Sequence, residues 1–146
     1  MFDDVRALYS DEIRRHGRSP SHAGRLPDAD ARAKGDNPMC GDRVEVFIRR
    51  SGPTISRATF DARGCEISIA SADLMCEAVS GLDADQIHTL ADDVEHLART
   101  GACPSCGAAL QPLSAVHEFP SRVKCVTLPW RALLAALDGG KESSSE

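Results

Sequence analysis

The sequence predicts a single α+β domain in which a small three-stranded antiparallel sheet packs against five or so helices. Two patterns predict this class: apolar and polar residues alternate along 44–62, and apolar residues recur at helical spacing along 2–16 and 67–101. A chain of 146 residues is also long enough for one domain to bury the surface it needs to fold without disulfide bonds. We expect the domain to span 1–138 and the polar residues 139–146 to form a disordered tail.

The first half of the chain is expected to hold one helix followed by the sheet. Apolar residues at helical spacing predict a helix over 2–16. Weak alternation predicts an edge strand over 29–34, and clear alternation predicts strands over 44–49 and 54–62. The Ser-Gly-Pro turn at 51–53 joins the last two strands into a hairpin.

The second half is expected to be helical. One helix is predicted over 67–79, and a stronger one is predicted between Asp83 and Gly101. Asp83 and Gln86 have the spacing of a capping box at its start, and Gly101 suits a left-handed cap at its end. These end signals make this helix the best defined element of the chain.

The stretch 116–137 is helix-like but contains two prolines. Pro120 and Pro129 lack amide donors, so we expect them to break the stretch into short helical pieces.

Composition excludes several classes of protein. With 22 acidic and 17 basic side chains the formal net charge is −5, which gives no electrostatic basis for binding nucleic acid. The apolar runs are far shorter than the about 20 residues of a membrane-spanning helix, and no export signal is visible. We therefore expect a soluble, cytoplasmic protein without membrane or nucleic-acid partners. In that reducing compartment, six cysteines indicate metal binding or catalysis rather than a disulfide framework.

Three cysteines stand at the boundaries of predicted elements, where a rigid scaffold can hold a site. Cys40 precedes a strand, Cys65 lies between a strand and a helix, and Cys125 lies in a late helical stretch. Asp42 follows Cys40 across Gly41, which allows a turn that brings the thiol and the carboxylate to one centre. Three thiolates and one carboxylate suit tetrahedral Zn²⁺, and the same soft ligands hold iron–sulfur clusters. The spacing matches no local zinc-finger pattern, so buried apolar packing of these cysteines stays open at this point.

Three segments of the chain resemble the signature segments of the NifU/IscU/SufU family of iron–sulfur cluster assembly proteins. They are NPMCGD at 37–42, GCEISIAS at 64–71 and KCVTLPW at 124–130. They occur in the family's order, and the similarity runs over about 5–138. The resemblance implies a SufE/NifU-like α+β fold with a three-stranded antiparallel sheet.

The resemblance also implies one exposed site in which four residues meet as metal ligands: Cys40, Asp42, Cys65 and Cys125. The scaffold branch of the family has a histidine before the last cysteine, whereas this chain has Lys124, whose ammonium cannot coordinate a metal. On this feature the chain is most similar to the SufU branch. Arg122 and Lys124 flank Cys125, where they are suited to attract anionic sulfur species or a partner carboxylate.

The SufU branch implies a zinc-bound acceptor that takes persulfide sulfur from a SufS-like cysteine desulfurase onto Cys40. Such a protein is a sulfurtransferase-like acceptor and not an autonomous enzyme. One alternative is a scaffold that assembles a [2Fe–2S] cluster, with iron or the cluster in place of zinc, and hands it to apo-proteins. A second, of another class, is a structural zinc-binding adaptor without sulfur transfer.

The remaining motif is the Cys-Pro-Ser-Cys-Gly stretch that contains Cys103 and Cys106. Three interpretations are open. The pair is one knuckle of a second zinc site, completed by a second subunit, Cys76 or His117; or it is a redox pair that forms a reversible disulfide; or it is a tight turn whose thiols have no function. Cys76 itself lies within a predicted helix and is expected to be core packing.

Overall fold

A computed structural model describes residues 10–38, 41–139 and 142–144 of the chain. Its elements in chain order are α1 (Asp11–Arg18), β1 (Ala31–Asn37), β2 (Asp42–Ser51), β3 (Thr54–Arg63), α2 (Glu66–Ala78), α3 (Ala84–Thr100), the 3₁₀ segments η2 (Pro104–Cys106) and η3 (Ala108–Glu118), α4 (Pro120–Leu137) and β4 (Glu142–Ser144).

The sheet has the strand order β3-β2-β1-β4. β1, β2 and β3 are antiparallel neighbours, which confirms the predicted three-stranded antiparallel sheet. β4 adds a short parallel strand beside 34–36 of β1, where the sequence predicts a tail without structure. The pairing is explained by the open edge of β1, whose backbone donors and acceptors are free to pair with another strand.

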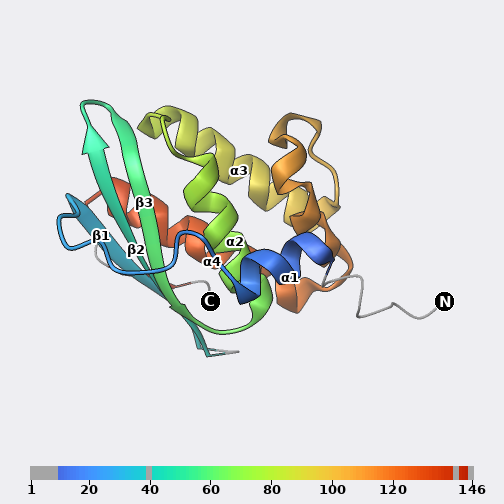
Figure 1. Cartoon of the computed structure of the whole chain (residues 1–146). Coiled ribbons are helices and arrows are strands. Elements are labelled where there is room, and N and C mark those ends of the chain that lie inside the picture. Colours follow the sequence, from blue (N-terminus) through green and yellow to red (C-terminus); the bar gives the residue numbers. More distant parts are fainter. Residues whose placement is uncertain (1–9, 39–40, 140–141, 145–146) are drawn as a thin grey trace.

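The helices cover one face of the sheet (Figure 1). α4 contacts β1 and β2, α2 contacts β3, and α3 lies against α4 on the side away from the sheet. Alternate sheet residues such as Val46, Ile48 and Phe60 are fully buried beneath these helices, as period-two alternation requires. Trp130 of α4 is also buried, in agreement with its expected place in the core.

Helix α3 has the predicted ends. The Asp83 carboxylate accepts the amide N–H of Gln86 at 2.9 Å, and the Gln86 side chain accepts the amide N–H of Asp83 at 3.0 Å. Gly101 ends the helix with φ of 83°, a left-handed conformation that glycine adopts without steric cost.

The structure differs from the predictions for two helices. The stretch 116–137 is not broken into short pieces: Pro120 begins α4, and the helix continues through Pro129 to Leu137. Pro120 costs no hydrogen bond because the first amides of a helix have no intrahelical partner, and Pro129 removes a single bond from a helix stabilised by packing. The first helix begins only at Asp11, after the N-cap Ser10, while 2–9 of the predicted helix lie outside the described residues.

In the part of the chain that the structure describes, no helix combines the length and the apolar character needed to cross a lipid bilayer.

Candidate metal centre

Three of the four predicted ligands converge in the structure. Asp42 is the first residue of β2, Cys65 is the N-cap of α2, and Cys125 lies in the second turn of α4. Their candidate ligand atoms all lie within 4.8 Å of one another. Asp42 and Cys125 are buried and Cys65 is half-buried, so the site opens toward solvent on the Cys65 side. The fourth predicted ligand, Cys40, lies outside the described residues.

The Asp42 carboxylate holds the loop that carries Cys65. One of its oxygens accepts the amide N–H of Cys65 at 3.1 Å, and the Cys65 sulfur lies 3.7 Å from the other oxygen. Gly64 permits this approach, since a Cβ atom at that position would lie only 2.8 Å from the Asp42 carboxyl carbon. The glycine before Cys65 is therefore required by the close packing of the site itself.

The Cys125 thiol and the start of helix α2 together stabilise the thiolate form of Cys65. The Cys65 sulfur caps the helix by accepting the amide N–H of Ser68 at 3.4 Å. The hydrogen bond with the Cys125 thiol is the largest cause that lowers the pKa of Cys65, from 9.0 to about 7, and the Ser68 amide adds to it against the opposing effect of burial. A large part of Cys65 is therefore thiolate at neutral pH.

The pKa of the Cys125 thiol is shifted in the opposite direction. Its hydrogen bond to Cys65, its burial and the nearby Asp42 charge all raise the pKa of its thiol far above the ordinary range. The two sulfurs thus share one proton without a metal, and a cation bound between them would displace it.

A hydrogen-bonded clamp fixes the two helices that carry these cysteines. The Ser71 hydroxyl of α2 donates to the backbone carbonyl of Val126, next to Cys125, at 2.7 Å. The Trp130 indole N–H donates to the same hydroxyl oxygen at 3.2 Å. The sequence places Ser71 only on a face of small residues, so its role as a link between α2 and α4 is a result of the structure.

The other flanking residues lie in the first turns of α4. Arg122 and Lys124 are both half-buried, and Lys124 precedes Cys125 directly. Their proposed attraction for anions stays a prediction.

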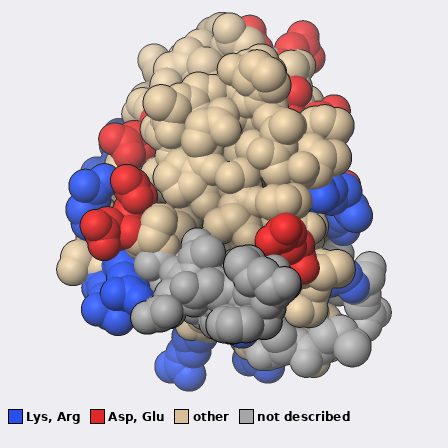
Figure 2. All heavy atoms as spheres, turned by 90° about the vertical axis from the view of Figure 1, so that its right-hand side faces the viewer, with Lys and Arg blue, Asp and Glu red and all other residues tan. Residues whose placement is uncertain are grey.

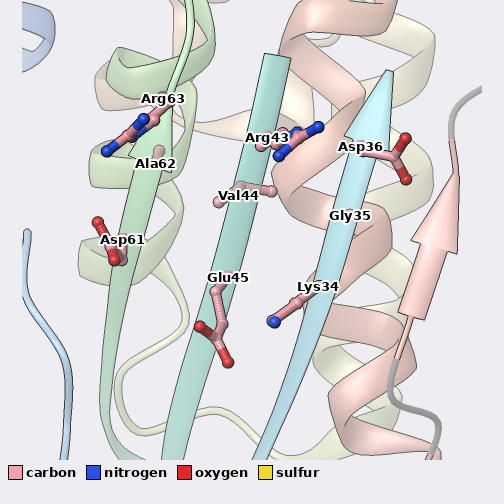
Figure 3. A pocket seen from close by; sticks show the side chains of 9 residues that line it. All are labelled: Lys34, Gly35, Asp36, Arg43, Val44, Glu45, Asp61, Ala62 and Arg63. Atoms are coloured by element: carbon pink, nitrogen blue, oxygen red, sulfur yellow. The ribbon is translucent and has the colours of Figure 1, made fainter. Parts of the chain in front are cut away.

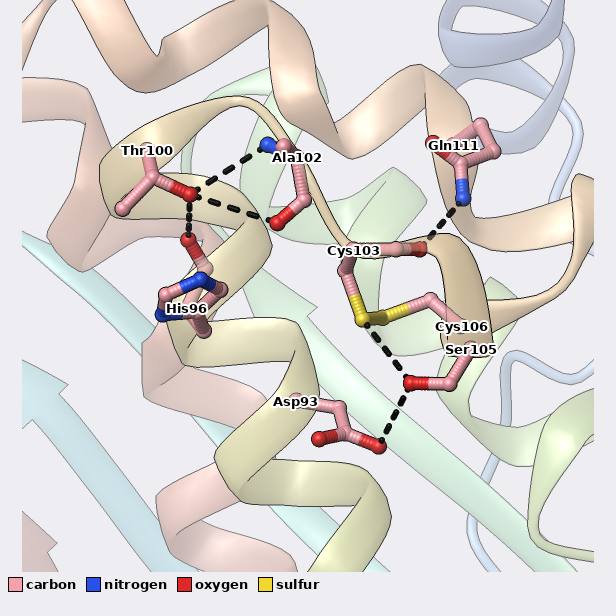
Figure 4. Close-up of a disulfide and its surroundings, with 8 residues drawn as sticks. All are labelled: Asp93, His96, Thr100, Ala102, Cys103, Ser105, Cys106 and Gln111. Atoms are coloured by element: carbon pink, nitrogen blue, oxygen red, sulfur yellow. Dashed lines mark hydrogen bonds between the residues drawn. A yellow bond between two sulfur atoms is a disulfide. The ribbon is translucent and has the colours of Figure 1, made fainter.

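Cys103 and Cys106 are joined to each other in a disulfide (Figure 4). The bond lies in the connection between α3 and η3, where Gln111 donates to the Cys103 carbonyl at 2.9 Å and Ser105 approaches Asp93 of α3 at 3.5 Å. This is the oxidised form of the redox-pair interpretation. A metal site at this pair requires its reduction first and stays a prediction.

Two histidines and an aspartate form a hydrogen-bonded cluster that the sequence does not indicate. Asp73 of α2 is fully buried; His16 Nδ1 lies 2.6 Å from one carboxylate oxygen and His22 Nδ1 lies 3.1 Å from the other. Asp73 also accepts the amide N–H of His22 at 2.8 Å, so this cluster links α1 and the following loop to α2.

Cys76, one turn further along α2, is buried. Its burial, and to a smaller extent the Asp73 charge, raise the pKa of its thiol. Cys76 is therefore an unreactive core residue, as expected.

Several known proteins are similar to this chain over most of its length. Residues 8–126 match the family model of the NifU-like N-terminal domain. The chain is 33% identical over 132 residues to the iron–sulfur cluster assembly scaffold protein IscU of Thermotoga maritima, covering 89% of this chain and 92% of that protein. It is 32% identical over 139 residues to the zinc-dependent sulfurtransferase SufU of Bacillus subtilis, covering 91% and 93%.

A solved structure has the same fold. The crystal structure of a protein from Fervidobacterium islandicum, titled a putative iron–sulfur cluster assembly scaffold protein for the SUF system, superposes with a TM-score of 0.83 at 27% identity, covering 92% of this chain and 99% of that one. The family match over most of the chain, the relatives above 30% identity and the shared fold agree. The chain therefore belongs to the family of NifU-like N-terminal domains, which includes proteins named IscU and SufU.

Proposed function

We propose that this protein serves iron–sulfur cluster assembly by accepting persulfide sulfur from a cysteine desulfurase on Cys40, beside a zinc ion. The observation that carries the proposal is the convergence of Asp42, Cys65 and Cys125 within 4.8 Å. The similarity to a relative named as a zinc-dependent sulfurtransferase supports it. Lys124 supports it as well, because it stands where the resemblance to the scaffold branch requires a metal-binding histidine.

The donor set fits zinc. Two sulfurs and one carboxylate leave one tetrahedral position for Cys40, the fourth ligand that the resemblance implies. Bound zinc would keep the ligating thiols deprotonated and would bring no redox chemistry of its own. The chain prepares this state, since the Cys65 thiol already has its pKa lowered to about 7.

The transfer itself is a thiol exchange at sulfur. The Cys40 thiolate attacks the terminal sulfur of the desulfurase cysteine persulfide. A sulfur–sulfur bond forms on Cys40 as the one in the desulfurase breaks, and the desulfurase cysteine leaves as a thiolate. Because one sulfur–sulfur bond replaces another, the step needs no external oxidant or reductant.

The test uses the zinc-loaded protein, a cysteine desulfurase and cysteine. We expect Cys40 to gain about 32 Da, the mass of one sulfur, in peptide mass spectra. The variant C40S should fold, accept no sulfur and fail to stimulate the desulfurase, whereas the matched control C76A, which removes a buried thiol outside the site, should behave as wild type. Unchanged stimulation by C40S contradicts the assignment.

A scaffold function is the second candidate, favoured by the similarity to relatives named as IscU scaffold proteins. In that case the cluster is the cargo, built on the same residues. Anaerobic reconstitution with iron and sulfide distinguishes the two candidates: a stable [2Fe–2S] spectrum and transfer to an apo-protein favour the scaffold. A protein that keeps its zinc but neither takes sulfur nor builds a cluster is the structural adaptor.

A further inference from the structure

Two arginines stand opposite each other at the end of the sheet that carries the metal centre. Arg43 follows Asp42 directly, and Arg63 precedes Cys65 by two residues. The two are register partners across β2 and β3. Figure 3 shows their side chains at the same end of the sheet, above Glu45 and Asp61.

Like charges on directly opposite strand residues destabilise a sheet unless other groups neutralise them. Both side chains are exposed, and within the described part of the chain neither forms an ion pair. Asp36 is the register partner of Arg43 on the other side, but its carboxylate points away from Arg43 in Figure 3. Among the described residues, no carboxylate is in ion-pair contact with either arginine; Glu45 and Asp61 lie two residues further along the same strands.

The arginine pair at the other end of the same two strands has different ion-pair contacts. Arg49 and Arg57 are also register partners across β2 and β3. There, however, Arg49 forms an ion pair with Asp28 at 2.7 Å. Arg25 and Arg32, which lie over the middle of the sheet, both approach Glu45. Among the described residues, the pair at the far end thus has a carboxylate partner for Arg49, although Arg57 forms no ion pair, whereas the pair beside the candidate metal centre has none for either member.

The surroundings give a partner room to reach these two arginines. A cavity of about 410 Å³ lies along the strand ends. Its charged lining consists of Lys34, Arg43 and Arg63 together with Asp36, Glu45 and Asp61. The connection from β3 to α2, which carries Cys65, lies at the lower end of Figure 1. Figure 2 shows the side of the molecule away from the sheet; there, basic side chains lie at the lower edge and on both flanks, and acidic side chains lie at the upper end, on the left flank and in the lower half. The end of the sheet beside the candidate metal centre thus carries a pair of exposed arginines that a partner can reach.

We propose that Arg43 and Arg63 form a docking pair for carboxylates on the cysteine desulfurase that delivers sulfur to this centre. The proposal rests on the proposed function. A guanidinium binds a carboxylate through two parallel hydrogen bonds, so two arginines recognise an acidic patch with defined orientation. Charge complementarity of this kind raises the association rate and sets the orientation of the complex. It would bring the desulfurase to the end of the sheet at which Asp42 and Cys65 lie.

The test compares charge reversal at the two ends of the paired strands β2 and β3. The double variant R43E/R63E and the milder R43Q/R63Q alter the pair. R57E is the matched control, because Arg57 is exposed on the same strand and face but lies six residues, about 20 Å, from Arg63. Each zinc-loaded variant is titrated against the cysteine desulfurase of the same organism, with desulfurase rate and peptide mass spectra of Cys40 as readouts.

We expect R43E/R63E to raise the half-saturating concentration about tenfold or more, with the rate at saturation retained, and R57E to change it less than about twofold. Binding of the wild type should weaken with added salt more steeply than binding of the double variant, because the docking charges are exposed. Zinc content and the Co²⁺ spectrum of the site should be unchanged in every variant.

Two results overturn the docking pair: equal effects of R43E/R63E and R57E, or a loss of zinc in R43E/R63E, which would mean that the arginines act through the metal centre. These results differ from failure of the proposed function, in which the wild type itself takes no sulfur on Cys40.

Discussion

The cysteines of the candidate metal centre and the cysteines of the disulfide differ in how each pair is assembled. Cys65 and Cys125 come from different helices and meet beside a buried carboxylate, and their sulfurs remain free thiols. Cys103 and Cys106 are three positions apart in one turn and close on each other. The sulfurs of Cys65 and Cys125, which separate elements bring together, stay free to bind a metal, whereas those of Cys103 and Cys106, which lie in one turn, are joined in their own disulfide. Cysteine reactivity here depends on the partner that the fold supplies, not on the number of cysteines.

The strongest test of this comparison replaces cysteines of each pair in turn. C65S should lower zinc affinity by about two orders of magnitude or more, because a neutral hydroxyl is a poor replacement for a thiolate ligand. C103S/C106S should keep about one zinc ion per chain. Metal analysis and competition with a chromophoric chelator measure both. A second zinc ion that disappears in C103S/C106S would show that the turn is a metal knuckle after all.

The second test measures how fast each free thiol reacts with an alkylating reagent in the metal-free protein. The pKa of Cys65 is lowered to about 7, so its thiolate forms as pH rises through that value and its alkylation slows as pH falls below it. Cys125 and Cys76 have raised pKa values and should react slowly at neutral pH. Iodoacetamide labelling from pH 5 to 9, read by peptide mass spectrometry, gives the pH of half-maximal rate for each thiol. Equal labelling of Cys65 and Cys125 would contradict the assignment of the shared proton.

Reduction of the disulfide tests whether that pair has a mainly structural role. The bond closes a short loop, so breaking it should lower the free energy of unfolding by about 2 kcal/mol or less. Urea unfolding with and without a phosphine reductant measures the difference, and C103S/C106S controls for effects of the reductant elsewhere. Zinc affinity should be the same in both states. A change in sulfur acceptance on reduction would instead link the two pairs.

The smallest expected effect concerns the clamp between α2 and α4. S71A leaves the Trp130 N–H and the Val126 carbonyl without their partner and should lower the free energy of unfolding by about 1–2 kcal/mol. Zinc affinity should fall severalfold with it, since Cys65 and Cys125 are then held less firmly. S105A, beside the disulfide, is the matched control and should leave zinc affinity unchanged. Unaltered zinc affinity in S71A would limit the clamp to a role in stability.

Much of the fold follows from local patterns. Alternation located β2 and β3, and the capping box with Gly101 located α3, because these signals depend on residues close together in the chain. The continuity of α4 through Pro129 could not be predicted in this way, since contacts with the sheet, α2 and α3 offset the hydrogen bond that proline removes. The cluster of Asp73 with His16 and His22 had no signal either, because its members come from separate elements.

The amino-acid sequence by itself determined the types of ligand and the elements that carry them: thiols and a carboxylate at the ends of strands and the starts of helices. Only the tertiary structure decided that Asp42, Cys65 and Cys125 meet, that the Cys65 thiol shares a proton with Cys125, and that two unpaired arginines border them. The physical reason is that hydrophobic periodicity encodes which face of an element is buried, whereas the distances between ligands are set by how β2, α2 and α4 pack together.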